Sequence, residues 1–119
     1  MVKEYSELKP ETRAIIEAIK AVPFGSVSSY RDIAWQAGLQ NGARQVVRTL
    51  HGLSEAYQLP WWRIIRADGR IGLPEPEKSL QIELLRAEKI EVTDAGRVLT
   101  EFVSFVSADN PLDPLIEDD

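Results

Sequence analysis

The sequence contains no cysteine, and its only histidine is His51. Without a thiol the chain cannot form a disulfide, a zinc-thiolate site, an iron-sulfur cluster or a cysteine nucleophile. A single imidazole likewise rules out a multi-histidine metal site and a cysteine-histidine catalytic pair. We therefore expect the protein to use no metal and no cofactor.

Long apolar runs are missing as well. No segment approaches the roughly 20 apolar residues that span a membrane, and the N-terminal MVKEYSELKPE lacks the apolar stretch of a signal peptide. We expect a soluble, cytoplasmic protein with no membrane partner. The 119 residues, 44% hydrophobic and 28% charged, suit one globular domain with one core.

The net charge of −5 conceals an uneven distribution of charged residues. Residues 107–119 carry five acids and no base, which predicts a disordered acidic tail after a domain at 1–106. Residues 30–72 hold six arginines and no lysine against three acids. Because the planar guanidinium suits phosphate and base edges, this segment favours nucleic acid as a ligand. The alternative is a solvated surface on which arginines pair with acids.

Apolar periodicity and capping residues predict three helices in the first half of the chain. The second and third are short and joined at a glycine, as in a helix-turn-helix. Arg44 and Arg48 are four residues apart and share one face of the third. The first helix is expected from Pro10 to the break at 23–25, the second from Tyr30 to Ala37 after a Ser28 or Ser29 cap, and the third from Asn41 or Gly42 to Gly52.

The second half of the chain predicts a small hairpin and one more helix. A strand is predicted at residues 63–66, and residues 67–70 have the Asp-Gly turn signature. Residues 71–73 are expected to form the second strand of this hairpin. A last helix over 78–89 should place Leu80, Leu84 and Leu85 on the core, followed by another small hairpin around 94–96. The fold class expected is α+β, mainly helical, with a winged helix-turn-helix.

Four segments of the chain together resemble one known family. The segments are VPFGSVSSYRDIA, AGLQNGARQVVRTL, PWWRIIRADGRIG and LLRAE. They are similar to the DNA-binding domain of the O6-alkylguanine-DNA alkyltransferases, and the resemblance covers roughly residues 10–92 of the chain. The resemblance implies the winged helix-turn-helix of the C-terminal domain of those enzymes. The active enzymes carry Pro-Cys-His-Arg where this chain has Pro60, Trp61, Trp62 and Arg63, so Trp61 occupies the methyl-acceptor position.

This replacement is similar to that in the alkyltransferase-like proteins, which bind alkylated guanine without repairing it. Trp62 stands at the position of the enzymes' histidine, Leu53 at that of the asparagine that orients it, and Glu88 matches the glutamate of the relay. Three of the four relay positions have changed, so the resemblance implies no catalytic residue and no enzyme. Glu88 is either a remnant of the relay or only a cap or ion-pair partner.

The resemblance also implies the residues that contact DNA. Arg44 would enter the base stack in place of the extruded base, and Tyr30 would rotate the neighbouring phosphate. The third helix would lie in the minor groove, where base information is mostly A·T versus G·C. Each of these residues also has a purely structural alternative. Arg44 would be an ordinary surface arginine, Tyr30 would pack on the core, and Trp61 and Trp62 would be packing residues. The DNA-binding residues expected are Ser28, Tyr30, Gly42, Ala43, Arg44, Gln45 and Arg48, and the lesion pocket is expected to be lined by Tyr30, Pro60, Trp61, Arg63, Ile71, Gly72 and Leu73.

We therefore expect a non-enzymatic DNA damage sensor that flips O6-alkylguanine out of duplex DNA and marks it for nucleotide excision repair. Its partners would be double-stranded DNA containing O6-alkylguanine and, by resemblance, nucleotide excision repair proteins. We expect a monomer in the bacterial cytoplasm, on the nucleoid when bound to DNA. Two alternatives remain: a winged-helix transcription regulator of undamaged DNA, and an enzyme whose alkyl acceptor is not cysteine.

Overall fold

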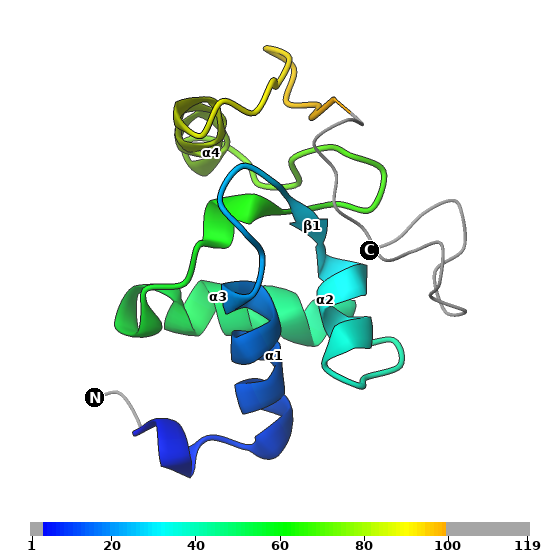
Figure 1. The fold of residues 1–119 in the computed structure, drawn as a ribbon, viewed down its shortest axis with the longest axis vertical. Coiled ribbons are helices and arrows are strands. Elements are labelled where there is room, and N and C mark those ends of the chain that lie inside the picture. The colour runs from blue at the N-terminus through cyan, green and yellow to red at the C-terminus, as the bar shows by residue number, and fades with distance from the viewer. Residues whose placement is uncertain (1–3, 100–119) are drawn as a thin grey trace.

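A computed structural model of the chain describes residues 4–99. The predicted tail at 107–119 and the domain boundary at 106 lie outside these residues. Figure 1 shows α1, α2 and α3 together in one half of the molecule and α4 in the other, with β1 between them. The elements are η1 (Tyr5–Glu7), α1 (Pro10–Lys20), β1 (Ser28–Ser29), α2 (Tyr30–Gln36), α3 (Ala43–Tyr57), η2 (Trp61–Arg63), β2 (Ile64–Ile65) and α4 (Glu77–Ala87).

The first two predicted helices begin where their sequence signals place them. Pro10 is the first residue of α1, where its fixed φ suits the helix and its missing N–H is not needed. Ser29 is the N-cap of α2, and its hydroxyl accepts a hydrogen bond from the Asp32 N–H at 2.9 Å. None of the helices within residues 4–99 has the length and apolar character to span a membrane.

Helix α3 is longer than the sequence predicts. Gly52 was expected to end it, but the helix continues to Tyr57 and ends at Gln58 in the left-handed conformation. A single glycine weakens a helix by only about 1 kcal/mol relative to alanine. Leu53 and Tyr57, which follow that glycine, pack against the core. This packing stabilises the helix beyond Gly52.

Gly42 allows α3 to begin directly on α2. A Cβ atom at this position would lie 2.8 Å from the Cβ of Leu39 and 3.2 Å from that of Ala34, closer than side chains approach. The glycine therefore serves the packing of the two helices, as well as the start of α3. This close pair forms the predicted helix-turn-helix.

The small sheet differs from the predicted hairpin. Strand β2 pairs in parallel with β1, with Ser28 opposite Ile64 and Ser29 opposite Ile65. Both isoleucines are fully buried between the two halves of the molecule. They therefore pair with β1 in the interior and not with residues 71–73. The pairing also places the start of α2 beside the chain that leaves Trp61 and Trp62.

The Asp-Gly turn forms as predicted, but the residue that follows it pairs with a different part of the chain than expected. The Arg66 N–H donates to the Arg70 carbonyl at 2.9 Å, which closes the turn. Arg70 then pairs with Arg97 in an antiparallel bridge, and Val92 pairs with Val98 across the second predicted turn. We call residues 66–71 together with 92–98 the wing.

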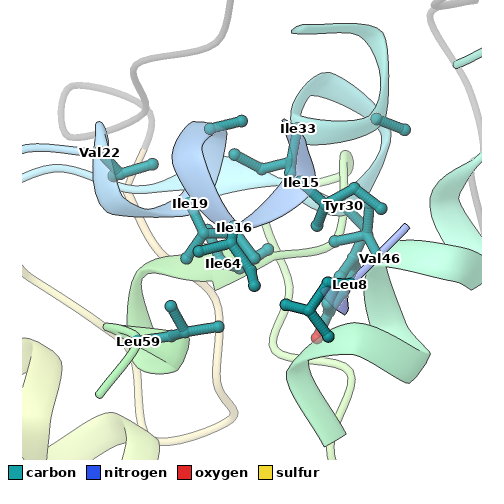
Figure 2. Packing of buried hydrophobic residues seen from close by; sticks show 12 residues of the cluster. Leu8, Ile15, Ile16, Ile19, Val22, Tyr30, Ile33, Val46, Leu59 and Ile64 are labelled. Atoms are coloured by element: carbon teal, nitrogen blue, oxygen red, sulfur yellow. The ribbon is translucent and has the colours of Figure 1, made fainter. Parts of the chain in front are cut away.

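The core consists of two clusters of buried side chains. The first includes Ile16 and Ile19 of α1, Tyr30 of α2, Val46 of α3 and Ile64 of β2 (Figure 2). The second joins the wing to α4. Its buried members are Val27, Ile65, Ile71, Leu85, Ile90, Val92 and Val98.

One prediction about α4 is wrong. Leu85 is buried as expected and Leu84 is half-buried, but Leu80 is 47% exposed. Gln81 is buried in place of Leu80, because its amide Nε2 donates to the carbonyls of Trp62 and Ile64 at 3.0 and 3.1 Å. A polar side chain is thus buried because it satisfies two carbonyl groups of the tryptophan segment.

Candidate nucleic-acid interface and tryptophan site

Helix α3 presents an exposed, positively charged face at its beginning. Arg44 and Arg48 are exposed one turn apart, Gln45 is half-buried, and Ala43 is the first residue of the helix. The first turn contains no acidic residue. Since the helix N-terminus is itself the positive end of the dipole, the two arginines add to a potential that attracts anions.

Val47 was not among the candidate residues, yet it lies on the same exposed face. It is 40% exposed, three residues after Arg44 and next to Arg48. Its spacing from Arg44 is the signal in the sequence that could have indicated this position. An apolar side chain between two arginines suits a surface that approaches sugars and base edges.

The side chains at the start of α2 point inward. The Ser28 hydroxyl is buried and donates to the Asp32 carboxylate at 3.4 Å, and that of Ser29 caps the helix. The Ser28 hydroxyl is thus engaged by Asp32 within the chain, and the DNA contact expected of Ser28 stays a prediction. Tyr30 is 7% exposed and packs in the first core cluster.

Two adjacent tryptophans occupy the short helix η2. Both are half-buried, with ring centroids 6.0 Å apart and ring planes at 87°, an edge-to-face arrangement. Pro60, also half-buried, is the N-cap of η2. The parallel pairing of β1 and β2 brings this segment beside the helix that begins at Tyr30.

Glu88 accepts hydrogen bonds from three places in the chain. The Trp62 indole Nε1 donates to its Oε2 at 2.7 Å, and the Gly25 N–H donates to its Oε1 at 2.9 Å. Arg63 completes the set, with its Nη2 at 2.8 Å from Oε2. Glu88 is buried at 6% exposure and Arg63 is 15% exposed, so the ion pair is largely shielded from water.

The surroundings of Glu88 determine its ionisation. Burial by itself raises the pKa of this carboxyl group, but the hydrogen bonds from Arg63, the Gly25 N–H and Trp62, together with the Arg63 charge, outweigh it. The net effect is a pKa lowered from the ordinary value of 4.5. Glu88 is therefore a buried carboxylate that remains charged at neutral pH.

We expect this pKa shift to make stability depend on acid pH. A carboxyl group with a lowered pKa in the folded state stabilises the fold above its unfolded-state pKa. That contribution should be lost as the pH falls below 4.5 and through the lower folded-state pKa. Urea unfolding between pH 7 and pH 2 measures it, with Glu88→Gln as the reference. The difference in unfolding free energy between the two proteins should shrink as the pH falls; a constant difference would contradict the shift.

Arg63 supports the tryptophan segment through interactions within the chain. Its guanidinium lies 5.7 Å from the ring centroid of Phe24 and 5.6 Å from that of Trp62, and its Nη1 donates to the Val22 carbonyl at 3.1 Å. With Glu88 as its ion partner, all of its interactions are internal. The place of Arg63 in the wall of a lesion pocket stays a prediction.

The remaining pocket candidates occupy the wing and the chain after it. Ile71 is 8% exposed and belongs to the second core cluster, so its role in the core is established by its burial. Leu73 is half-buried against the same cluster, and Gly72 is exposed beside the Arg66 side chain. Trp61, the first residue of η2, and Pro60, its N-cap, are both half-buried. Within residues 4–99 no group of three potential ligand side chains is placed to hold a metal ion.

The family model and the relatives that match this chain all concern proteins that bind DNA or flip its bases. The family model "6-O-methylguanine DNA methyltransferase, DNA binding domain" matches residues 10–90. A DNA base-flipping protein of Vibrio parahaemolyticus is 39% identical over 84 residues, 71% of this chain and 84% of that protein. The Escherichia coli DNA base-flipping protein is 37% identical over 69% of this chain, and the match spans 64% of its own length.

A solved structure matches the fold as well. Schizosaccharomyces pombe Atl1, in complex with damaged DNA containing O6-carboxymethylguanine, has a TM-score of 0.69 and 27% identity. The match covers 82% of this chain and 96% of the other. The family resemblance and the mainly helical winged helix-turn-helix expected from the sequence are confirmed.

Proposed function

This chain belongs to the family of the 6-O-methylguanine DNA methyltransferase DNA-binding domain, and on that premise we propose that it is a non-enzymatic sensor of O6-alkylguanine in duplex DNA. The observation that carries the proposal is the tryptophan site. Trp61 stands where the active enzymes have the acceptor cysteine, and the Trp62 indole donates to Glu88 where they have a histidine. Relatives named as base-flipping proteins support it.

Recognition would require the damaged base to leave the stack. Extrusion costs a few kcal/mol and is cheapest at a weakened base pair. Alkylation at O6 removes the N1 proton of guanine and weakens its pairing with cytosine, so the lesion lowers its own extrusion cost. Arg44, exposed at the start of α3, would fill the vacated position, because a flat guanidinium stacks on bases and donates to the orphaned cytosine.

The other proposed contacts follow the geometry of the site. Gly42, Ala43, Gln45 and Arg48 would lie along the DNA with α3, and Tyr30 would act at the phosphate beside the extruded nucleotide. Trp61, half-buried in η2, would form a wall for the extruded base, bordered by Pro60, Gly72 and Leu73.

The same site would bind without reacting. An indole N–H donates a hydrogen bond but cannot accept a proton, whereas imidazole does both. The Trp62–Glu88 pair therefore cannot draw a proton from an acceptor group, and the sequence holds no thiol. Binding energy would be used to hold the extruded base, which marks the site for other proteins.

We also propose, from the family resemblance, that nucleotide excision repair proteins act on the marked site and that the protein functions as a monomer in the bacterial cytoplasm. Pull-down of the excision machinery by the lesion-bound protein, compared with the free protein, tests the first point. Sedimentation at micromolar concentration tests the second.

We expect the protein to bind a duplex with one O6-methylguanine about 10- to 100-fold more tightly than the matched undamaged duplex, the range that a few kcal/mol of recognition supplies. Fluorescence anisotropy on the two duplexes measures the ratio, and intact-protein mass spectrometry after incubation detects transfer. Equal affinities would instead favour a regulator that reads undamaged DNA. A mass gain equal to one methyl group would show an enzyme with another acceptor.

We expect Trp61→Cys alone to give negligible methyl transfer. An unperturbed cysteine has a pKa of about 8.5 and is mostly protonated at pH 7, and no base is present to activate it. Trp61→Cys combined with Trp62→His should transfer slowly, because the imidazole would lie between the thiol and Glu88. Single-turnover loss of label from an O6-methylguanine duplex measures both. A single variant as fast as a natural alkyltransferase would contradict the loss of the relay.

A further inference from the structure

The wing gathers four basic side chains from distant parts of the sequence. Arg66 and Arg70 flank the turn, and Arg70 lies directly opposite Arg97 in the antiparallel bridge. The Lys78 Nζ, from the beginning of α4, lies 3.6 Å from the place a Cβ on Gly96 would occupy. We call Arg66, Arg70, Lys78 and Arg97 the wing cluster.

Little negative charge balances the wing cluster. Asp68 lies 3.6 Å from Arg66, but within residues 4–99 no carboxylate is at ion-pair distance from Arg70, Lys78 or Arg97. Arg97 instead donates its Nη1 to the Asp68 carbonyl at 3.2 Å. The excess of positive charge on the wing is local, since residues 4–99 as a whole carry equal numbers of basic and acidic side chains.

This arrangement opposes folding. Like charges directly opposite each other on paired strands destabilise the pairing, and Arg70 and Arg97 are such a pair. Both side chains are exposed, so their charged groups are available to an anion. Guanidinium groups bind phosphate oxygens in pairs of parallel hydrogen bonds, which makes phosphate the fitting anion.

The position of the cluster points to the phosphates of the same DNA molecule. Arg66 is five residues beyond Trp61, a separation of at most about 18 Å of extended chain. Successive phosphates along one strand are about 3.4 Å apart along the axis. If Trp61 faces the extruded base, the cluster lies within about five phosphates of it.

We propose that the wing cluster is a second DNA contact that binds the phosphodiester backbone beside the lesion, independently of sequence and of damage. The inference rests on the proposed function for its ligand, duplex DNA. Phosphate contacts position a protein on the duplex and carry no base information. The wing cluster would therefore contribute affinity, while α3 and Trp61 would contribute lesion recognition.

The test uses three variants of the wing cluster: Arg70→Gln, Arg97→Gln and the double variant. The control is Lys20→Ala, which removes one exposed positive charge from α1. Dissociation constants are measured for undamaged and O6-methylguanine duplexes over a range of salt concentrations. The double variant should weaken both duplexes by the same factor and reduce the slope of log K against log salt by about 2, since each phosphate contact contributes about 0.9. Lys20→Ala should leave the slope unchanged.

The outcomes separate this inference from the proposed function. An unchanged slope in the double variant, or an equal change in Lys20→Ala, would overturn the wing contact, and so would selective loss of lesion preference. If the unsubstituted protein shows no preference for the lesion, the proposed function fails, but the slope on undamaged DNA still decides the inference. Thermal unfolding confirms that each variant is folded, and removal of opposed charges should not lower its stability.

Discussion

Replacing Glu88 with alanine is expected to lower the free energy of unfolding by about 3–5 kcal/mol, the effect of breaking a buried ion pair by removing one partner. The substitution leaves the largely buried Arg63 guanidinium between Phe24 and Trp62 without its carboxylate partner. It also deprives the Trp62 indole N–H and the Gly25 N–H of their acceptor.

Urea unfolding at pH 7 measures the effect, and the chain offers a matched control. Asp94→Ala breaks the Arg86–Asp94 pair, in which the Asp94 side chain is fully exposed, and should leave stability unchanged within error. A double variant, Glu88→Met with Arg63→Leu, should be more stable than Glu88→Ala, because neither partner is then left as a buried charge. A loss in Glu88→Ala no larger than in Asp94→Ala would contradict the structural role of this carboxylate.

The largest expected effect on function follows from Arg44→Ala. We expect the preference for the O6-methylguanine duplex to fall by about 10- to 100-fold, the range for losing an arginine that contacts bases. A side chain that replaces the extruded base stabilises only the flipped state. Affinity for undamaged duplex, in which the base remains stacked, should change much less.

Arg48→Ala is the matched control, because Arg48 is also exposed and lies one turn further along α3. It should weaken both duplexes by a similar factor, as expected of a phosphate contact that is blind to the base. Arg44→Lys adds a second comparison, since it keeps the charge but loses the flat guanidinium. If Arg44→Ala and Arg48→Ala weaken both duplexes equally, Arg44 does not enter the stack.

Local signals predicted much of this fold correctly. Pro10 begins α1, Ser29 caps α2 and the Asp-Gly pair at 68–69 forms a turn, because each depends on the backbone geometry of a few adjacent residues. The family motifs likewise depend on residue identity at fixed spacing, and the matched family model confirms the family. Composition alone established that the chain has no thiol to accept an alkyl group.

Local signals failed where burial and distant contacts decide. Gly52 does not end α3, because residues beyond it pack on the core, and Leu80 is exposed while Gln81 is buried on two carbonyl groups. Ile64 and Ile65 pair with β1 instead of with 71–73, since both must be buried. In each case the energy of tertiary packing exceeds a local preference of about 1 kcal/mol.

The sequence by itself determined that the chain has no thiol. The family resemblance implied that Trp61 and Trp62 stand at the positions of the reactive pair and that Glu88 is either a remnant of the relay or an ion-pair partner. Only the tertiary structure decided that Glu88 is the buried acceptor for Trp62, Arg63 and Gly25, and that Arg66, Arg70, Lys78 and Arg97 meet on the wing. The reason is physical: a carboxylate 26 residues from Trp62 and an arginine 29 residues from Asp68 interact through the folded chain, and no local pattern encodes such separations.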